Sequence, residues 1–137
     1  MPATLLVNID VDDIDAAESF YARAFGLTLG RRLGPEVVEL LGAGAPIYLL
    51  AKPAGTRACD GSAQRRDYRR HWTPVHLDFV VEDIEAALGR ALEAGASLEG
   101  GIRDHDWGRI ASLADPFGHG LCLLQFKGRG YDALVEA

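Results

Sequence analysis

The chain has 137 residues, of which 48% are hydrophobic and 25% charged, so it has the length and composition of one globular domain. Fourteen basic and twenty acidic side chains leave a net charge of −6, which argues against non-specific binding to nucleic acid or to anionic lipid. No apolar stretch approaches the roughly 18 residues that a membrane span requires, so neither nucleic acid nor a membrane is an expected partner.

The first residues lead directly into an apolar segment and show neither the basic region nor the cleavage pattern of a secretory signal. Two cysteines, Cys59 and Cys122, are too few for a disulfide-stapled scaffold, and neither belongs to a Cys-x-x-Cys pair. We therefore expect a cytoplasmic protein in which both thiols are reduced.

An internal repeat organises the chain. Residues 11–17, with the sequence VDDIDAA, reappear as VEDIEAA at residues 81–87. A strand-like run precedes each copy, at residues 5–11 and 75–81, and apolar residues at helical spacing follow it. The predicted helices have a capping aspartate before the first turn and a glycine at the end, namely Asp13 with Gly26 and Asp83 with Gly95.

Short strand-like pieces follow each predicted helix, separated by glycine-rich or Asp-Pro turns. They lie at residues 27–31, 36–41 and 46–51 in the first half and at residues 97–100, 109–114 and 120–126 in the second. Each half is therefore predicted to run strand, helix, and then three strands. Because about fifty residues bury too little apolar surface alone, the halves are expected to pack together or to exchange with a second subunit.

The repeat divides one predicted α+β domain into two modules. Module one covers about residues 4–52 and module two about residues 74–127. A polar, basic connector at residues 53–73 joins them, and a tail of residues 128–137 follows module two.

Four short motifs add to the repeat: SFY at residues 19–21, FGL at 25–27, WGR at 107–109 and DPFGH at 115–119. With them the chain resembles the vicinal oxygen chelate superfamily, which includes glyoxalase I, extradiol dioxygenases, and fosfomycin and bleomycin resistance proteins. The resemblance covers nearly the whole chain. It implies paired βαβββ modules that form a half-open, cup-shaped mixed sheet, with helices on the convex side and a ligand site within.

Alternation along the first strand of each module predicts which side chains face away from the helix. The odd-numbered residues of 75–79 are apolar and are expected to cover the helix, which leaves His76 and Asp78 on the inner face. The same pattern in the first module leaves Asn8 on its inner face. Polar groups there need partners, so these residues are candidates for ligand contact, with a structural hydrogen bond as the alternative for each.

In metal-dependent relatives, the resemblance implies four ligand positions, which in this sequence are Leu6, Tyr48, His76 and Cys122. Leucine has no donor atom, and only His76 is of the usual ligand type. His76 and a Cys122 thiolate make two good ligands, against three in a typical catalytic zinc site. We therefore expect no metal at the usual centre and no other cofactor; the alternative left open is a divalent metal with His76 as a ligand.

Cys122 and His76 also suggest a nucleophile and its base, because an imidazolium beside a thiol lowers the pKa of the thiol. The competing interpretation, which we favour, is that Cys122 is a small buried hydrophobic residue in a Leu-Cys-Leu-Leu strand. Tyr48 is a further ligand-binding candidate, because its hydroxyl needs a polar environment.

The connector carries five arginines between residues 57 and 70, followed by Trp72. These side chains offer forked donors and an aromatic face to an anionic or planar ligand, whereas the alternative, which we favour, is a solvated surface loop. Trp72 is retained as a ligand-binding candidate, together with Trp107 and Arg109 of the WGR motif.

The sequence thus predicts a small-molecule-binding protein of the glyoxalase and bleomycin resistance type. Family resemblance and the edges of two small sheets predict a homodimer. The alternative function is that of a glyoxalase-like lyase, isomerase or transferase acting on a small oxygenated substrate, with His76 as metal ligand or general base.

Overall fold

The computed structural model describes residues 1–135, and every structural statement below refers to that part of the chain. The chain separates into two compact units, one of residues 1–69 and the other from residue 70 onward. The division falls inside the predicted connector, so residues 70–73 belong to the same unit as module two.

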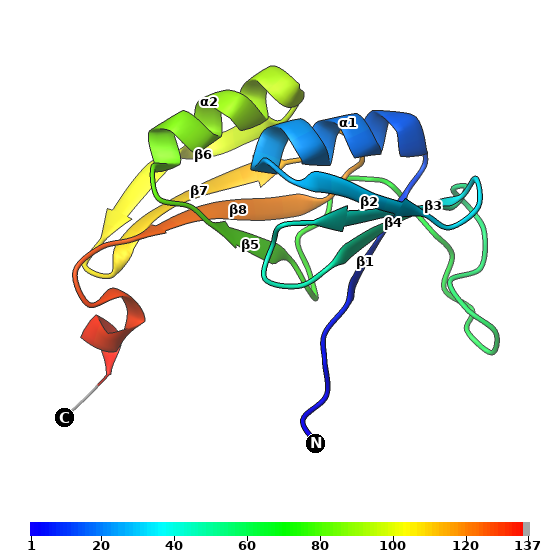
Figure 1. Ribbon diagram of the computed structural model, residues 1–137, viewed down its shortest axis with the longest axis horizontal. Coiled ribbons are helices and arrows are strands. Elements are labelled where there is room, and N and C mark those ends of the chain that lie inside the picture. The colour runs from blue at the N-terminus through cyan, green and yellow to red at the C-terminus, as the bar shows by residue number, and fades with distance from the viewer. Residues whose placement is uncertain (136–137) are drawn as a thin grey trace. The chain divides into compact units, whose positions relative to one another are not determined.

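Module one is a four-stranded sheet with one helix on one face (Figure 1). Its elements are β1 (Val7–Val11), α1 (Ile14–Phe25), β2 (Thr28–Arg32), β3 (Val37–Leu41) and β4 (Ile47–Ala51). The strand order is β1-β4-β3-β2, with β1 parallel to β4 and the other neighbours antiparallel. The helix α1 contacts β2, β3 and β4 and buries Phe20 and Tyr21 almost completely.

Module two repeats this arrangement. Its elements are β5 (Leu77–Val80), α2 (Ile84–Ala94), β6 (Ser97–His105), β7 (Gly108–Ala114) and β8 (Gly120–Phe126), followed by a short 3₁₀ helix, η1 (Gly130–Leu134). The strand order is β5-β8-β7-β6, and β5 runs parallel to β8. The predicted α+β fold of paired βαβββ modules is therefore confirmed.

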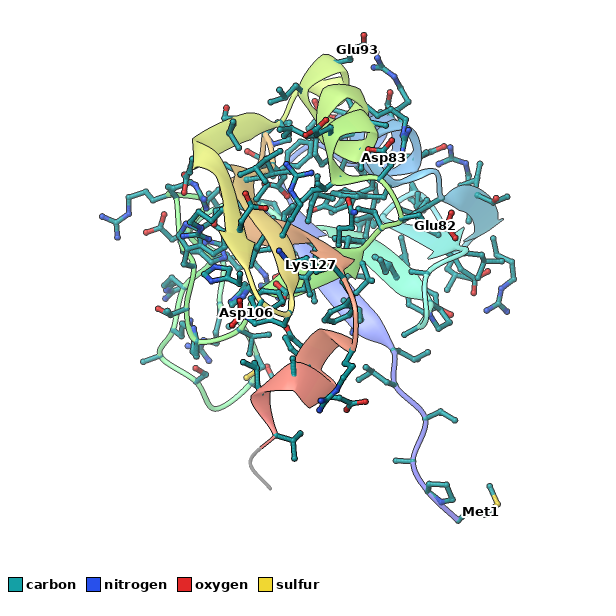
Figure 2. All side chains as sticks on the ribbon, turned by 90° about the vertical axis from the view of Figure 1, so that its left-hand side faces the viewer. Met1, Glu82, Asp83, Glu93, Asp106 and Lys127 are labelled. Carbon is teal, nitrogen blue, oxygen red and sulfur yellow. The ribbon has the colours of Figure 1, made fainter. Side chains whose placement is uncertain are left out.

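Both helices begin at the predicted aspartates. The Asp13 carboxylate accepts a hydrogen bond from the backbone N–H of Ala16 at 3.1 Å, and Asp83 accepts one from Ala86 at 3.1 Å. Figure 2 labels Asp83 at the beginning of α2 and Glu93 near its end. The helix α1 ends at Gly26, which adopts φ of 64° as a left-handed cap. Among the described residues, no helix has the length and apolar content needed to cross a membrane.

Three strand boundaries differ from the sequence prediction by two residues or more. The strands predicted from residues 5 and 75 begin only at Val7 and Leu77. Val75, which alternation places against the helix, is instead 77% exposed, because the chain joins the sheet only at Leu77. The strand predicted to end at residue 100 continues to His105, where it pairs with Gly108 across the turn that contains Asp106 (Figure 2).

Candidate functional site

One face of the second sheet carries a row of polar side chains across all four of its strands. Asp78 of β5 is the register partner of Cys122 of β8, Cys122 is the partner of Ser112 of β7, and Ser112 is the partner of Glu99 of β6. Directly opposed residues in a ladder point to the same side of the sheet. The other side of β7 and β8 carries the buried core residues that α2 covers: Ala111, Leu113, Leu121 and Leu123.

At the β5 end of this row, three potential metal ligands come together. The donor atoms of His76, Asp78 and Cys122 all lie within 4.8 Å of one another. The Nε2 atom of His76 is 3.3 Å from Oδ1 of Asp78, and these two side chains are 42% and 36% exposed. Cys122 is 4% exposed. The group therefore offers nitrogen, oxygen and sulfur donors that are compatible with a divalent metal.

The surroundings of Cys122 disfavour its thiolate. Burial raises the pKa of the thiol, and the negative charge of Asp78 raises it further. The Ser112 hydroxyl, whose Oγ lies 4.0 Å from Sγ, acts in the opposite direction. A catalytic cysteine instead needs a lowered thiol pKa, so these contacts support the buried structural interpretation of Cys122 over that of a nucleophile activated by His76.

Trp72 borders the same face. Its ring lies against Gly120, at a place where any side chain larger than hydrogen would overlap the indole. Its Nε1 donates a hydrogen bond to Glu99 at 2.9 Å, and its ring centroid is 5.5 Å from that of His76. The Arg70 guanidinium lies 4.9 Å from the indole centroid and also donates to Glu99, at 2.5 Å. Hydrogen bonds from Arg70 and then Trp72 lower the pKa of Glu99.

In the matching row of module one, the polar side chains form hydrogen bonds with one another and with Arg31. Asn8 of β1 opposes Tyr48 of β4, which opposes the buried Glu39 of β3. The Tyr48 hydroxyl donates to Glu39 at 2.7 Å, and Arg31 donates to both carboxylate oxygens, at 3.0 and 2.7 Å. Hydrogen bonds from Arg31 and then Tyr48 lower the pKa of Glu39 to about 2. The bond to Glu39 also raises the pKa of Tyr48.

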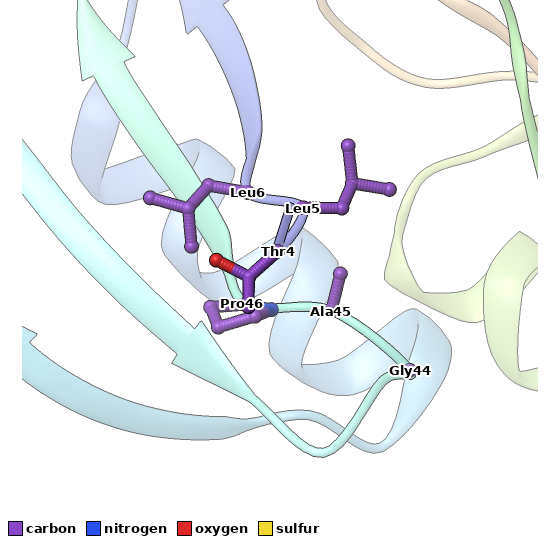
Figure 3. Close-up of a pocket in the computed structure, with 6 residues that line it drawn as sticks. All are labelled: Thr4, Leu5, Leu6, Gly44, Ala45 and Pro46. Carbon is purple, nitrogen blue, oxygen red and sulfur yellow. The ribbon is translucent and has the colours of Figure 1, made fainter. Parts of the chain in front are cut away.

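These hydrogen bonds bear on whether the two family ligand positions of module one, Leu6 and Tyr48, can bind a metal ion. Tyr48 would have to lose a proton that Glu39 holds in a hydrogen bond. Leu6 lies before β1, is 56% exposed, and lines an open pocket together with Thr4, Leu5, Gly44, Ala45 and Pro46 (Figure 3). Neither residue suits a metal ion, so module one supplies no ligand for the usual centre, whereas His76 and Cys122 of module two both carry donor atoms.

Trp107 and Arg109 do not join the polar row of module two. The Trp107 ring stacks on His105 at 5.0 Å between centroids and lies near Phe126 and Tyr131. Arg109 has the opposite parity to Ser112 along β7, and its guanidinium donates to Glu85 of α2 and to Asp104, both at 3.0 Å. The alternation of β7 therefore places Arg109 on the helix-covered face, where its partners are structural.

Two connector arginines, Arg66 and Arg70, form ion pairs with carboxylates of their own units. The side chain of Arg66 is only 14% exposed, and it donates to Asp10 at 2.7 Å and to the backbone carbonyl of Ala58 at 3.1 Å. Arg70 is held by Glu99. The connector is thus tied to its own units through specific ion pairs, which composition alone did not reveal.

The sequence analysis did not predict three polar residues of these faces: Glu39, Ser112 and Glu99. A signal for two of them was present, because the alternation that assigns Asn8 and His76 to the inner face applies equally to the strands at residues 36–41 and 109–114. Glu39 and Ser112 are the polar residues between buried apolar ones there. No local signal indicated Glu99, since its partners Trp72 and Arg70 precede it by more than twenty residues.

Residues 6–124 match the family model of the Glyoxalase-like domain. The chain belongs to this family. The resemblance to the vicinal oxygen chelate superfamily, predicted from the repeat and the motifs, is thereby confirmed. The glyoxalase-like domain occurs in proteins of different activities, so the family by itself does not name the reaction or the ligand.

Relatives of this glyoxalase-like domain include an uncharacterised protein of Mycobacterium tuberculosis strain H37Rv, 33% identical over 129 residues that cover 85% of this chain and 75% of that protein. The anthracycline biosynthesis protein DnrV of Streptomyces peucetius is 32% identical over 93% of this chain but only 42% of its own length. The fosfomycin resistance protein FosX from Listeria monocytogenes superposes with a TM-score of 0.70 at 16% identity, over 93% of this chain and 95% of that one. The last likeness shows the fold alone.

Proposed function

We propose that the protein binds a small organic molecule at the polar face of module two, without the four-residue metal centre of its metal-dependent relatives. The observation that carries the proposal is the polar row Asp78–Cys122–Ser112–Glu99, with His76 at its end. His76 and Asp78 are partly exposed, so their hydrogen-bonding atoms are accessible to a ligand. Convergent polar groups are typical of small-molecule sites.

One relative supports an oxygenated ligand. DnrV is named for anthracycline biosynthesis, and anthracyclines are small molecules rich in oxygen. A histidine N–H donates to a carbonyl or hydroxyl oxygen of such compounds, and a carboxylate accepts from a hydroxyl group. We therefore expect a ligand that presents several oxygen atoms to His76 and Asp78.

A thermal-shift screen on protein treated with a chelator tests this proposal. The probes are fosfomycin, an anthracycline, and a set of hydroxy and keto acids. A ligand present at about 100 times its Kd stabilises the native state by about 2.7 kcal/mol, which raises Tm measurably. Asp78→Asn is expected to weaken binding of the hit by about tenfold or more, since it removes a charged hydrogen-bond acceptor.

Asp104→Asn is the matched control, because Asp104 is also an exposed strand carboxylate in module two but is paired with Arg109. Binding in this variant should equal that of the wild type. Unchanged affinity in Asp78→Asn, or no stabilisation by any member of the panel, would contradict the proposal.

The second candidate function is that of a glyoxalase-like lyase, isomerase or transferase with His76 as general base. It is favoured by one observation, the 3.3 Å distance between Oδ1 of Asp78 and Nε2 of His76, because a carboxylate beside an imidazole holds the ring in a fixed orientation. Turnover of the ligand identified above that disappears in His76→Gln, while binding persists, would select this function.

We further propose that the protein is a cytoplasmic homodimer. The two cysteines support an intracellular location, since Cys59 and Cys122 are unpaired. The strands β1 and β5 each end their sheet, and such edges are commonly covered by another chain.

A further inference from the structure

We propose that His76, Asp78 and Cys122 form a zinc site that module two builds alone. This inference goes beyond ligand binding, and it differs from the usual centre of the family because Asp78 occupies none of the four expected ligand positions. The sequence offered only two good ligands. The structure adds the third, since the donor atoms of all three side chains lie within 4.8 Å of one another.

The backbone holds these donors in place. Asp78 and Cys122 are register partners in the parallel pair of β5 and β8, so their side chains stand next to each other on the same face. His76 lies two residues before Asp78, and its Nε2 atom is 3.3 Å from Oδ1 of Asp78. Because His76 precedes the first residue of β5, its side chain can adjust without breaking the ladder.

The distances require only small rotations. Zinc bonds of about 2.0–2.3 Å in a tetrahedron place the ligand atoms roughly 3.3–3.8 Å apart. The Nε2 atom of His76 and Oδ1 of Asp78 are already 3.3 Å apart. The Cys122 sulfur, at most 4.8 Å from the other donors, therefore has to approach each of them by no more than about 1.3 Å.

The donor set selects the metal. One imidazole nitrogen, one carboxylate oxygen and one thiolate sulfur suit Zn²⁺, whereas Mg²⁺ and Ca²⁺ prefer oxygen ligands throughout. The thiol releases its proton to solvent when the metal binds, and the two negative ligands then balance the charge of the ion. Three protein ligands leave a fourth position for water or for an oxygen atom of a bound ligand.

Cobalt(II) titration of chelator-treated protein tests the site, because Co²⁺ replaces Zn²⁺ and a thiolate ligand produces a near-ultraviolet sulfur-to-cobalt charge-transfer band. We expect one equivalent of Co²⁺ to develop this band and one equivalent of Zn²⁺ to abolish it, with no effect of Mg²⁺. The band should persist in Cys59→Ser, which removes the other, exposed cysteine, and disappear in Cys122→Ser.

The Asp78→Asn variant distinguishes the proposed site from the family centre, because Asp78 is a ligand only in the proposed site. Loss of a supporting outer-shell partner already costs a metal site about 10–100-fold in affinity, so removal of a direct ligand should cost at least as much. Tyr48→Phe should leave the affinity unchanged. Far-ultraviolet circular dichroism and thermal unfolding of each variant confirm folding; Cys122 is buried, so the partly exposed Asp78 provides the informative variant if Cys122→Ser does not fold.

Absence of a cobalt band in the wild type would overturn the inference, as would a band lost in Cys59→Ser or an Asp78→Asn affinity equal to that of the wild type. The outcome is independent of the proposed ligand binding, because the ligand screen uses metal-free protein. A zinc site without any organic ligand, and an organic ligand without zinc, are thus distinguishable results.

Discussion

Glu39 shows how much one side chain organises in module one. Its carboxylate receives the Tyr48 hydroxyl, the Arg31 guanidinium and, at 3.0 Å, the backbone N–H of Arg31. A buried carboxylate is tolerated only when its oxygens are satisfied in this way. Gly30, at the register shift of the neighbouring strand β2, leaves room for it, since a Cβ there would lie 2.6 Å from Oε1 of Glu39.

A pH-dependent contribution to stability follows from this arrangement. The pKa of Glu39 falls from 4.5 to about 2 in the folded protein, so folding favours the ionised form. That stabilisation is complete above the unfolded pKa of 4.5 and is lost as the pH falls through 4.5 toward 2. Glu39→Gln should therefore lower Tm at pH 7, and the difference from the wild type should shrink on acidification over this range.

Thermal unfolding followed by circular dichroism at several pH values measures this difference. Glu36→Gln serves as the control, because Glu36 is an exposed acid of the same segment. A Glu39→Gln deficit that stays constant from neutral to acidic pH would contradict the assigned role of the ionised carboxylate.

At the scale of elements, the start of α2 connects the helix to its own sheet. Asp83 accepts a hydrogen bond from the N–H of Ala86, and the side chain of Gln125 in β8 accepts one from the N–H of Ile84 at 2.8 Å. Two of the four unpaired N–H groups of the first turn are thereby satisfied, one locally and one by a neighbouring strand. The helix is positioned on the sheet by a polar contact as well as by its apolar face.

Removing the local cap should have a measurable cost. We expect Asp83→Ala to lower the free energy of unfolding by about 1 kcal/mol, the usual value for an aspartate cap. Urea denaturation monitored by circular dichroism measures it. Glu82→Ala, at the exposed neighbouring acid labelled in Figure 2, should change it by less than about 0.5 kcal/mol. Equal effects of the two substitutions would show that Asp83 does not act as a cap.

At the scale of the whole molecule, the described residues form two four-stranded sheets. The two outermost strands of each sheet pair with one neighbouring strand only. In module one these are β1 and β2, and in module two they are β5 and β6. Open strand edges carry unpaired backbone donors and acceptors, and natural proteins cover or interrupt them. Both β2 and β6 are interrupted by a register shift against their neighbour, whereas the pairing of β1 and of β5 is regular.

The expected consequence is a dimer. Light scattering after gel filtration should give twice the chain mass of 14.8 kDa at micromolar concentration. A mass equal to that of one chain across the accessible concentration range would exclude the homodimer.

Much of the fold was predictable because its signals are local. The repeat at residues 11–17 and 81–87, the aspartate caps and the alternation of the strands are all readable within a few residues. The pairing of Tyr48 with Cys122 as equivalent positions was also predicted, and the register confirms it, since each opposes the inner residue of its parallel neighbour, Asn8 or Asp78.

The residues that the motifs misplaced depend on contacts distant in sequence. Arg109 belongs to a motif shared with the family, yet the parity of β7 turns it toward Glu85 of α2. Val75 has the right alternation but lies before the point at which the chain joins the sheet. The face of Arg109 follows from alternation along β7, but its partner Glu85 is distant in sequence, and the exposure of Val75 depends on where the chain joins the sheet.

By itself, the sequence determined the paired modules, their helices and caps, and the family, because periodicity and capping act over one or two turns of chain. Only the tertiary structure decided which polar groups meet. It placed Asp78 beside His76 and Cys122, so that three potential metal ligands meet. It also bonded the Tyr48 hydroxyl to Glu39, which the Arg31 guanidinium binds as well. Those groupings depend on the register between strands separated by many residues, which no local pattern specifies.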